Sequence, residues 1–276
     1  MMHVSKRKNK GLTLIEIMIS LLLGLIVIGG AISMYISTIR SSSDIVKSAR
    51  LNYDLDSVMQ LMANDIKRAG YWGGAVTESD TRLNPFTLPT TTINIRTLAN
   101  PTVDPSPNAG DCILYSYDAD EDGNIDDNND IDDVDDINEH YGFKLDRGAV
   151  WIRYSGATTA SCADGLWERI TDENEVLVTN LQFSFLATAA QVAIANTQPA
   201  LPALTATSRC LNITADTVTN AINCATVLTP VTAGDDIAQK RVINIHLSGY
   251  VNGDISVVKS LSSSVQVSND RIYTAP

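Results

Sequence analysis

Carboxylate side chains recur at every second position early in the segment 118–126, which reads D-A-D-E-D-G-N-I-D. In a tight loop, alternate side chains turn inward, so their oxygen atoms can converge on one hard cation. Gly123 stands at the sixth position, where such loops turn sharply. The pattern D-x-D-x-D-G therefore predicts a Ca²⁺ site. Its expected ligands are Asp118, Asp120, Asp122, Asn124 through its backbone carbonyl, and Asp126 directly or through water.

The end of this loop departs from the usual twelve-residue calcium loop. Asn129 stands at the twelfth position, where a bidentate glutamate normally closes the site. Asp130 or Asp132 is a candidate substitute, and the weaker ligand set predicts an affinity of about 10⁻⁴ to 10⁻³ M. The flanking segments have the pattern of strands rather than helices. The alternative is a solvated acidic loop that binds no cation.

Residues suited to catalysis are scarce. The chain has three histidines, and the two beyond the N-terminal segment, His140 and His246, lie near no nucleophile motif. No glycine-rich phosphate-binding loop is present in the sequence. We therefore expect no enzymatic activity.

An apolar run from Ile17 to Ile39 contains no charge and no proline over 23 residues. A helix of this length, rising about 1.5 Å per residue, crosses a hydrocarbon core about 30 Å thick. Four basic residues precede the run within positions 6–10. Because positive charge stays on the cytoplasmic side, the C-terminal body is expected to be exported.

Four cysteines lie beyond the apolar run, and an even number in an exported body suggests disulfides. Three pairings are possible. We favour Cys210 with Cys224, because they bracket one low-complexity segment, which leaves Cys112 with Cys162. The alternative is buried free thiols.

The helix is expected to continue past the membrane, because no proline interrupts residues 12–69. Residues 40–70 are polar, with an apolar stripe at steps of three and four, and Gly70 is a plausible helix terminator. The stripe comprises Leu51, Leu55, Met59, Met62, Ile66 and Ala69.

The remaining segment, 71–276, reads as an α+β body around an antiparallel sheet. Strand patterns occur at 112–117, 141–145, 149–154, 166–170, 176–186, 242–247 and 255–267. Two segments, 77–110 and 187–236, read as insertions, with a short strand near 92–95 in the first and a short helix within 217–224 in the second.

The charge of the chain is strongly negative, at −12. Twelve acidic residues and no lysine or arginine lie within 118–139. Such a surface argues against nucleic acid as a partner, because phosphate contacts require Lys and Arg.

The N-terminal residues also carry a recognisable motif: Gly11, then Leu12, and Glu16 ahead of the apolar run. This resembles the class III signal of type IV prepilins and type II secretion pseudopilins, although Leu12 stands where the family most often has Phe. The resemblance implies that prepilin peptidase removes the leader 1–11, cutting between Gly11 and Leu12, and that the new amino terminus is methylated. Residues 12–39 then form the membrane and pilus-core half of the helix.

Glu16 falls fifth in the chain that this cleavage produces. Its carboxylate needs a cation in an apolar bundle, and the family logic offers the α-amino group of an adjoining subunit, which would fix axial register. The alternative is an interfacial acid that extends toward water and has no role.

The segment Arg68–Gly73, which follows the helix, and the acidic loop near residue 120 look like those of PilW-type minor pilins. That resemblance implies a pilin-like fold and a role in assembly initiation and twitching motility, at or near the pilus tip. It implies other minor pilins, the major pilin and prepilin peptidase as partners, with a large tip adhesin as a further candidate. The expected location is the bacterial inner membrane, with a periplasmic body, and then the pilus at the cell surface.

Two alternatives remain open from the sequence. One is a minor pseudopilin of a type II secretion system, which shares the N-terminal motif. The other is a calcium-dependent adhesive module that contacts surfaces directly.

Overall fold

The computed structural model describes residues 11, 13–73, 80–98, 109–125, 139–185, 208–220, 224 and 232–275. These residues fall into two compact units, 1–49 and 50–276. One helix, α1 (Leu14–Ile66), contributes residues to both units.

In the first unit, α1 is apolar over residues 14–39, and its large side chains there are exposed. By length and composition it is able to cross a membrane. The hydroxyls of Ser20, Ser33 and Thr38 donate to carbonyls four residues earlier, at 2.7–2.9 Å. These three hydroxyls thereby have acceptors within the helix, as a lipid environment requires.

In the second unit, residues 50–66 of α1 form a core helix. The predicted stripe is confirmed, because all six of its residues are buried, together with Val58. α1 ends at Ile66, and the chain tightens into a turn in which the Ala69 amide donates to the Ile66 carbonyl at 3.1 Å. Gly70 follows with φ +75°, the left-handed conformation expected of a residue that terminates a helix.

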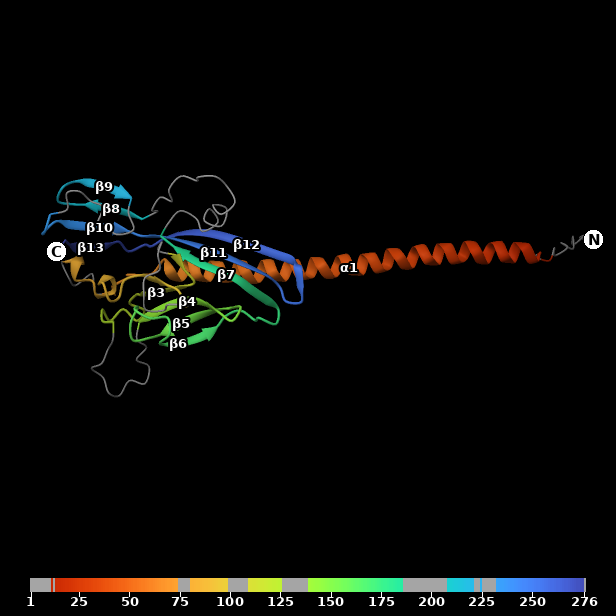
Figure 1. The fold of residues 1–276 in the computed structure, drawn as a ribbon, viewed down its shortest axis with the longest axis horizontal. Helices are drawn as coiled ribbons and strands as arrows, with labels where there is room; N and C mark the ends of the chain where they lie inside the picture. The colour runs from red at the N-terminus through yellow and green to blue at the C-terminus, as the bar shows by residue number, and fades with distance from the viewer. Residues whose placement is uncertain are drawn as a thin grey trace, which may run out of the picture. The chain divides into compact units, whose positions relative to one another are not determined.

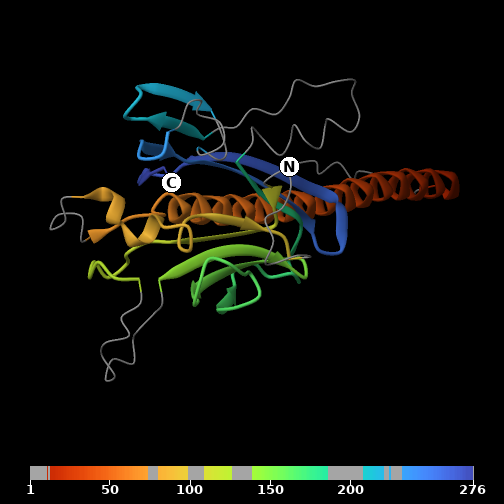
Figure 2. The same cartoon turned by 60° about the vertical axis from the view of Figure 1, so that its left-hand side comes forward.

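Two antiparallel sheets enclose this part of α1, as Figures 1 and 2 show. Side chains from both sheets join the helix stripe in one hydrophobic core. The first sheet has the order β1 (Asn94–Arg96), β3 (Cys112–Ser116), β4 (His140–Asp146), β5 (Ala149–Ser155) and β6 (Leu166–Arg169). The second has the order β12 (Asp254–Gln266), β11 (Val242–Val251), β7 (Val176–Ser184) and β2 (Ala109–Gly110).

A third antiparallel sheet has the order β13 (Arg271–Thr274), β10 (Asp236–Lys240), β8 (Arg209–Asn212) and β9 (Thr217–Asn220). The predicted α+β class, with a long N-terminal helix packed on antiparallel strands, is therefore confirmed. The described residues of the body form three sheets, where the sequence suggested one.

The two predicted insertions contribute more regular structure than expected. Segment 77–110 supplies the short helices η2 (Thr81–Leu83) and η3 (Pro85–Thr87), followed by β1 and β2. Segment 187–236 supplies β8 and β9, so the helix predicted within 217–224 is wrong over residues 217–220. These residues pair instead with β8, in the register Arg209↔Asn220 to Asn212↔Thr217.

Both disulfides favoured by the sequence are present. Cys112 in β3 is joined to Cys162, with a Cα–Cα distance of 6.6 Å, and Cys210 in β8 is joined to Cys224, with a distance of 5.4 Å. All four half-cystines are buried. The first bridge links the start of β3 to the β5–β6 connection, and the second links β8 to the segment beyond β9.

Candidate functional site: the end of the core helix and the acidic loop

The residues after α1 are hydrogen-bonded to the end of β3, where the acidic loop begins. The Gly70 amide donates to the Ser116 carbonyl at 2.8 Å, and the Asp118 amide donates to the Tyr71 carbonyl at 3.0 Å. The buried Asn84 side chain also donates to the Gly70 carbonyl at 2.9 Å. The helix end and the start of the loop are thus fixed to each other by backbone bonds.

Three consecutive residues that follow α1, at positions 71–73, contact the loop. The Tyr71 hydroxyl donates to Oε1 of Glu121 at 3.2 Å. The Trp72 indole donates to the Gly123 carbonyl at 3.2 Å, and the Gly73 amide donates to Oδ2 of Asp118 at 2.7 Å. Residues 71–73 and the acidic loop are therefore in direct contact.

The first three predicted calcium ligands converge. One carboxylate oxygen from each of Asp118, Asp120 and Asp122 lies within 4.8 Å of the other two. Asp118 is 0 % exposed, whereas Asp120 and Asp122 face solvent. Oδ2 of Asp118 also accepts from the Gly123 amide at 3.1 Å, but its Oδ1 is buried and has no hydrogen-bond partner among the described residues.

The rest of the predicted ligand set is only partly described. The Asn124 amide donates to Oδ1 of Asp122 at 2.7 Å, which curls the loop back on itself. Gly123 has φ +87°, as the sharp turn requires, and Glu121 has φ +68°, which is unusual for a residue with a side chain. Asp126 and Asp130 lie outside the described residues.

Sequence reasoning missed a fourth carboxylate, Glu139, which immediately precedes β4. Its Oε1 accepts a short hydrogen bond from the Ala119 amide, within the loop. Its side chain is 5 % exposed, and Oε2 is buried with no described partner. Its sequence signal was its place as the last of the twelve acids, but nothing in the sequence indicates that it folds back on Ala119.

Burial of these carboxylates in a negative environment changes their protonation. Burial raises the pKa of Glu139 to about 8, and the neighbouring Asp118 and Asp120 add to the rise. Burial also raises the pKa of Asp118, although the Gly73, Glu121 and Gly123 amides oppose that rise. Among the described residues, no lysine or arginine forms an ion pair with any of the four carboxylates.

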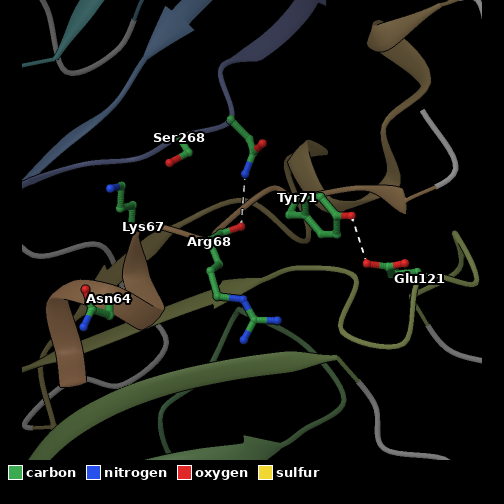
Figure 3. A pocket seen from close by; sticks show the side chains of 7 residues that line it. Asn64, Lys67, Arg68, Tyr71, Glu121 and Ser268 are labelled. Atoms are coloured by element: carbon green, nitrogen blue, oxygen red, sulfur yellow. Dashed lines mark hydrogen bonds between the residues drawn. The ribbon is translucent and has the colours of Figure 1, made fainter. Parts of the chain in front are cut away.

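A pocket of about 380 Å³ opens beside the loop, with Tyr71 and Glu121 in its wall (Figure 3). The Arg68 guanidinium lies 4.0 Å from the ring centroid of Tyr117, and the Asn269 side chain donates to the Arg68 carbonyl at 3.2 Å. The lining residues are Asn64, Lys67, Arg68, Tyr71, Glu121, Ser268 and Asn269. The conformation of the loop therefore sets the shape of one side of this pocket.

Asp65, in the last turn of α1, holds the helix to β3. Its Oδ2 accepts from the Tyr115 hydroxyl at 2.5 Å, and its Oδ1 accepts from the Tyr117 hydroxyl at 2.9 Å. Burial raises the pKa of Tyr115 well above its ordinary value, with the Asp65 charge as the next cause. A charged acceptor with two buried donors makes this contact a strong one.

The predicted processing residues lie at the start of α1. Gly11 and Glu16 are exposed, and Leu12 lies outside the described residues. The Thr13 amide and hydroxyl each lie 3.4 Å from Oε2 of Glu16, and the Glu16 amide lies 3.4 Å from the Thr13 hydroxyl. This reciprocal arrangement is a capping box, which the spacing T-x-x-E already contained and which sequence reasoning missed.

Comparison with protein families gives two matches. A model of the prokaryotic N-terminal methylation motif matches residues 6–32, which include Gly11, Leu12 and Glu16. A model described as prepilin peptidase-dependent protein B matches residues 44–267, which include the helix end, the acidic loop and every strand except β13. Comparisons with curated proteins and with solved structures give no match. Because the second family model spans most of the chain, this protein belongs to the prepilin peptidase-dependent protein B family.

Proposed function

We propose that the protein is a minor subunit of a type IV pilus, of the PilW kind, that helps to initiate assembly and occupies a position at or near the tip. The observation that carries this proposal is α1 itself. It begins three residues after Gly11 and exposes large apolar side chains throughout residues 14–39. An apolar helix of this kind must be covered by lipid or by other helices.

The order of events follows from that helix. Before assembly, residues 14–39 lie in the inner membrane, and the body faces the periplasm because the basic residues precede the helix. Prepilin peptidase then removes residues 1–11, and the helix moves from lipid into a bundle of subunit helices. Glu16 is the residue that pairs with a neighbouring subunit in this bundle. Other minor pilins and the major pilin are the partners of this subunit, and a large tip adhesin is a further partner.

The role is non-catalytic in this proposal. His246 contacts the hydroxyls of Ser262 and Ser260, at 3.0 and 3.3 Å, on the polar face of β11 and β12. Burial lowers the pKa of His246, and no charged neighbour contributes to that change. A serine–histidine contact without a carboxylate to orient the imidazole is a weak candidate for nucleophilic catalysis.

The test compares a deletion strain with the same strain complemented by the wild-type gene. The proposal expects the deletion to reduce surface pili and twitching, and expects the protein in sheared pili at far below the amount of the major pilin. Unchanged pili together with loss of secreted exoproteins would instead assign the chain to a type II secretion pseudopilus.

A further inference from the structure

We propose that Asp118, Asp120, Asp122 and Glu139 bind one Ca²⁺ ion, with Glu139 in the role of the missing closing glutamate, and that the ion fastens the acidic loop to the end of α1. This inference does not depend on the pilus role. It rests on two buried oxygen atoms, Oδ1 of Asp118 and Oε2 of Glu139, that have no described partner.

The two oxygen atoms of each buried carboxylate, in Asp118 and in Glu139, have different surroundings. Oδ2 of Asp118 accepts from the Gly73 and Gly123 amides, and Oε1 of Glu139 accepts from the Ala119 amide. In both residues one oxygen holds the loop backbone and the other remains free. A buried polar atom without a partner is costly, so a native structure that retains two of them beside one loop calls for a ligand.

The carboxylates at the acidic loop also concentrate negative charge. Three carboxylates, Asp118, Asp120 and Asp122, converge, and Glu139 contacts the same loop at the Ala119 amide. The described residues supply no basic side chain that forms an ion pair with any of the four. Either protons or a metal cation must relieve the repulsion. The donor set is entirely oxygen, which hard cations prefer. Ca²⁺ suits this set better than Mg²⁺, because it accepts many carboxylates at flexible distances, whereas Mg²⁺ prefers to keep its waters.

A bound ion would hold the acidic loop to the residues that follow α1. Asp118 is bonded to the Gly73 amide, and Gly123 accepts from the Trp72 indole, so the loop and the helix end share these residues. A cation bound by Asp118 therefore stabilises the contact with residues 71–73. It also fixes Glu121, which is bonded to Tyr71 and lines the same pocket as Lys67 and Arg68 (Figure 3).

The experiment uses the full chain in non-ionic detergent, stripped of metal with a chelator. Tb³⁺, a luminescent substitute for Ca²⁺, is titrated in and excited through tryptophan, since Trp72 contacts the loop. Ca²⁺ and Mg²⁺ are then compared as competitors, and the melting temperature is followed with each cation. We expect sensitised emission that millimolar Ca²⁺ displaces and Mg²⁺ displaces at least tenfold less effectively, with a Ca²⁺-dependent rise of a few degrees in melting temperature.

Variants assign the site. Glu139→Gln keeps an oxygen for the Ala119 amide but removes the charge, and is expected to weaken Ca²⁺ binding at least tenfold. Asp122→Asn, at an exposed position, is expected to weaken it similarly with little effect on folding. Glu168→Gln, an exposed acid on β6, is the matched control and should bind Ca²⁺ as the wild type does. Trp72→Phe should reduce Tb³⁺ emission but preserve the thermal response to Ca²⁺.

Three results would overturn the proposal. One is a wild-type chain that gives no Tb³⁺ emission and no thermal response to Ca²⁺. Another is an equal response to Ca²⁺ and Mg²⁺ that both Glu139→Gln and Asp122→Asn leave unchanged. The third is a metal-free chain that Glu139→Gln stabilises and that does not respond to Ca²⁺, because Glu139 would then be a buried neutral acid.

Discussion

The backbone amide of Gly73, just beyond the end of α1, donates a 2.7 Å hydrogen bond to Oδ2 of Asp118, the first carboxylate of the acidic loop. The helix end and the loop are 45 residues apart in the chain, yet this bond makes them one structural unit. A change in the conformation of the loop should therefore alter the residues that follow α1.

Gly73→Ala tests this contact directly. A Cβ atom at Gly73 would meet the Glu121 Cα at 3.0 Å and Oδ2 of Asp118 at 3.1 Å, so the loop would have to move. We expect a loss of about 1 to 3 kcal/mol in the free energy of unfolding, with altered Trp72 fluorescence. Gly24→Ala is the control, because its Cβ meets nothing within 4 Å. Equal stability and fluorescence in Gly73→Ala and wild type would show that the loop accommodates the added Cβ atom, and would contradict this prediction.

Asp65→Asn tests how the helix is held to β3. The variant loses the charged acceptor for the Tyr115 and Tyr117 hydroxyls, and its amide nitrogen cannot accept either bond. We expect it to lower the free energy of unfolding at pH 7 by about 1 to 3 kcal/mol, measured by chemical denaturation. Asp44→Asn, in the exposed first unit, is the control. A Asp65→Asn chain as stable as the control would mean that the two tyrosines find other acceptors.

The same tyrosines predict a loss of stability at alkaline pH. Burial raises the pKa of Tyr115 above that of an unfolded tyrosine, which is about 10. Below pH 10 the Tyr115 hydroxyl keeps its proton in both the folded and the unfolded state, so its contribution to the free energy of unfolding is fully present. Above pH 10 the unfolded state loses the proton first, so stability falls as pH rises. Tyr115→Phe and wild type, compared in thermal melts between pH 8 and pH 11, should differ in the slope of melting temperature against pH, and identical slopes would contradict the assignment to Tyr115.

The two disulfides should contribute unequally to the stability of the folded protein. They join residues separated by 50 and 14 positions, and the chain-entropy model assigns about 4 and about 3 kcal/mol to loops of these lengths. The pair Cys112→Ser with Cys162→Ser should therefore lower the melting temperature more than the pair Cys210→Ser with Cys224→Ser. Non-reducing peptide mapping should recover only these two links. A cross-link between Cys112 and Cys210 would refute the pairing.

Glu16→Ala separates insertion from assembly. Removing a charge makes the helix more apolar, so membrane insertion should be unchanged. The loss of the carboxylate should nevertheless reduce recovery of the protein in sheared pili, because the neighbouring amino group loses its partner. Thr13→Ala disrupts the same capping box but keeps the carboxylate, and should be incorporated normally. Equal incorporation of Glu16→Ala and wild type would show that Glu16 does not set register.

The helix could be read from the sequence because its signals are local. The absence of proline and the spacing of Leu51, Leu55 and Met62 are properties of nearby residues, and they predicted both the continuity of α1 and its buried face. The alternating carboxylates of the loop were equally local. The disulfide pairing followed from which cysteines bracket one segment.

The features that sequence reasoning missed depend on contacts between distant residues. Glu139 reaches Ala119 across 20 positions, and no periodicity signals that approach. For the same reason, the number of sheets could not be inferred from the strands alone. Residues 217–220 read T-V-T-N, and their β-branched residues favour the strand that pairs with β8, so the helix prediction overlooked a local signal. The capping box of Thr13 and Glu16 was also an exception, because its pattern was visible but the charge of Glu16 had already been given another role.

The mass of the N-terminal peptide, measured on protein isolated from cells with active prepilin peptidase, tests the central claim most directly. A chain that starts at Leu12 with an N-methyl group is the predicted result, and a peptidase-deficient strain, which should retain residues 1–11, is the control. If the chain from cells with active peptidase still begins at Met1, then the Gly11–Glu16 motif is not a processing signal, and the account of assembly is contradicted.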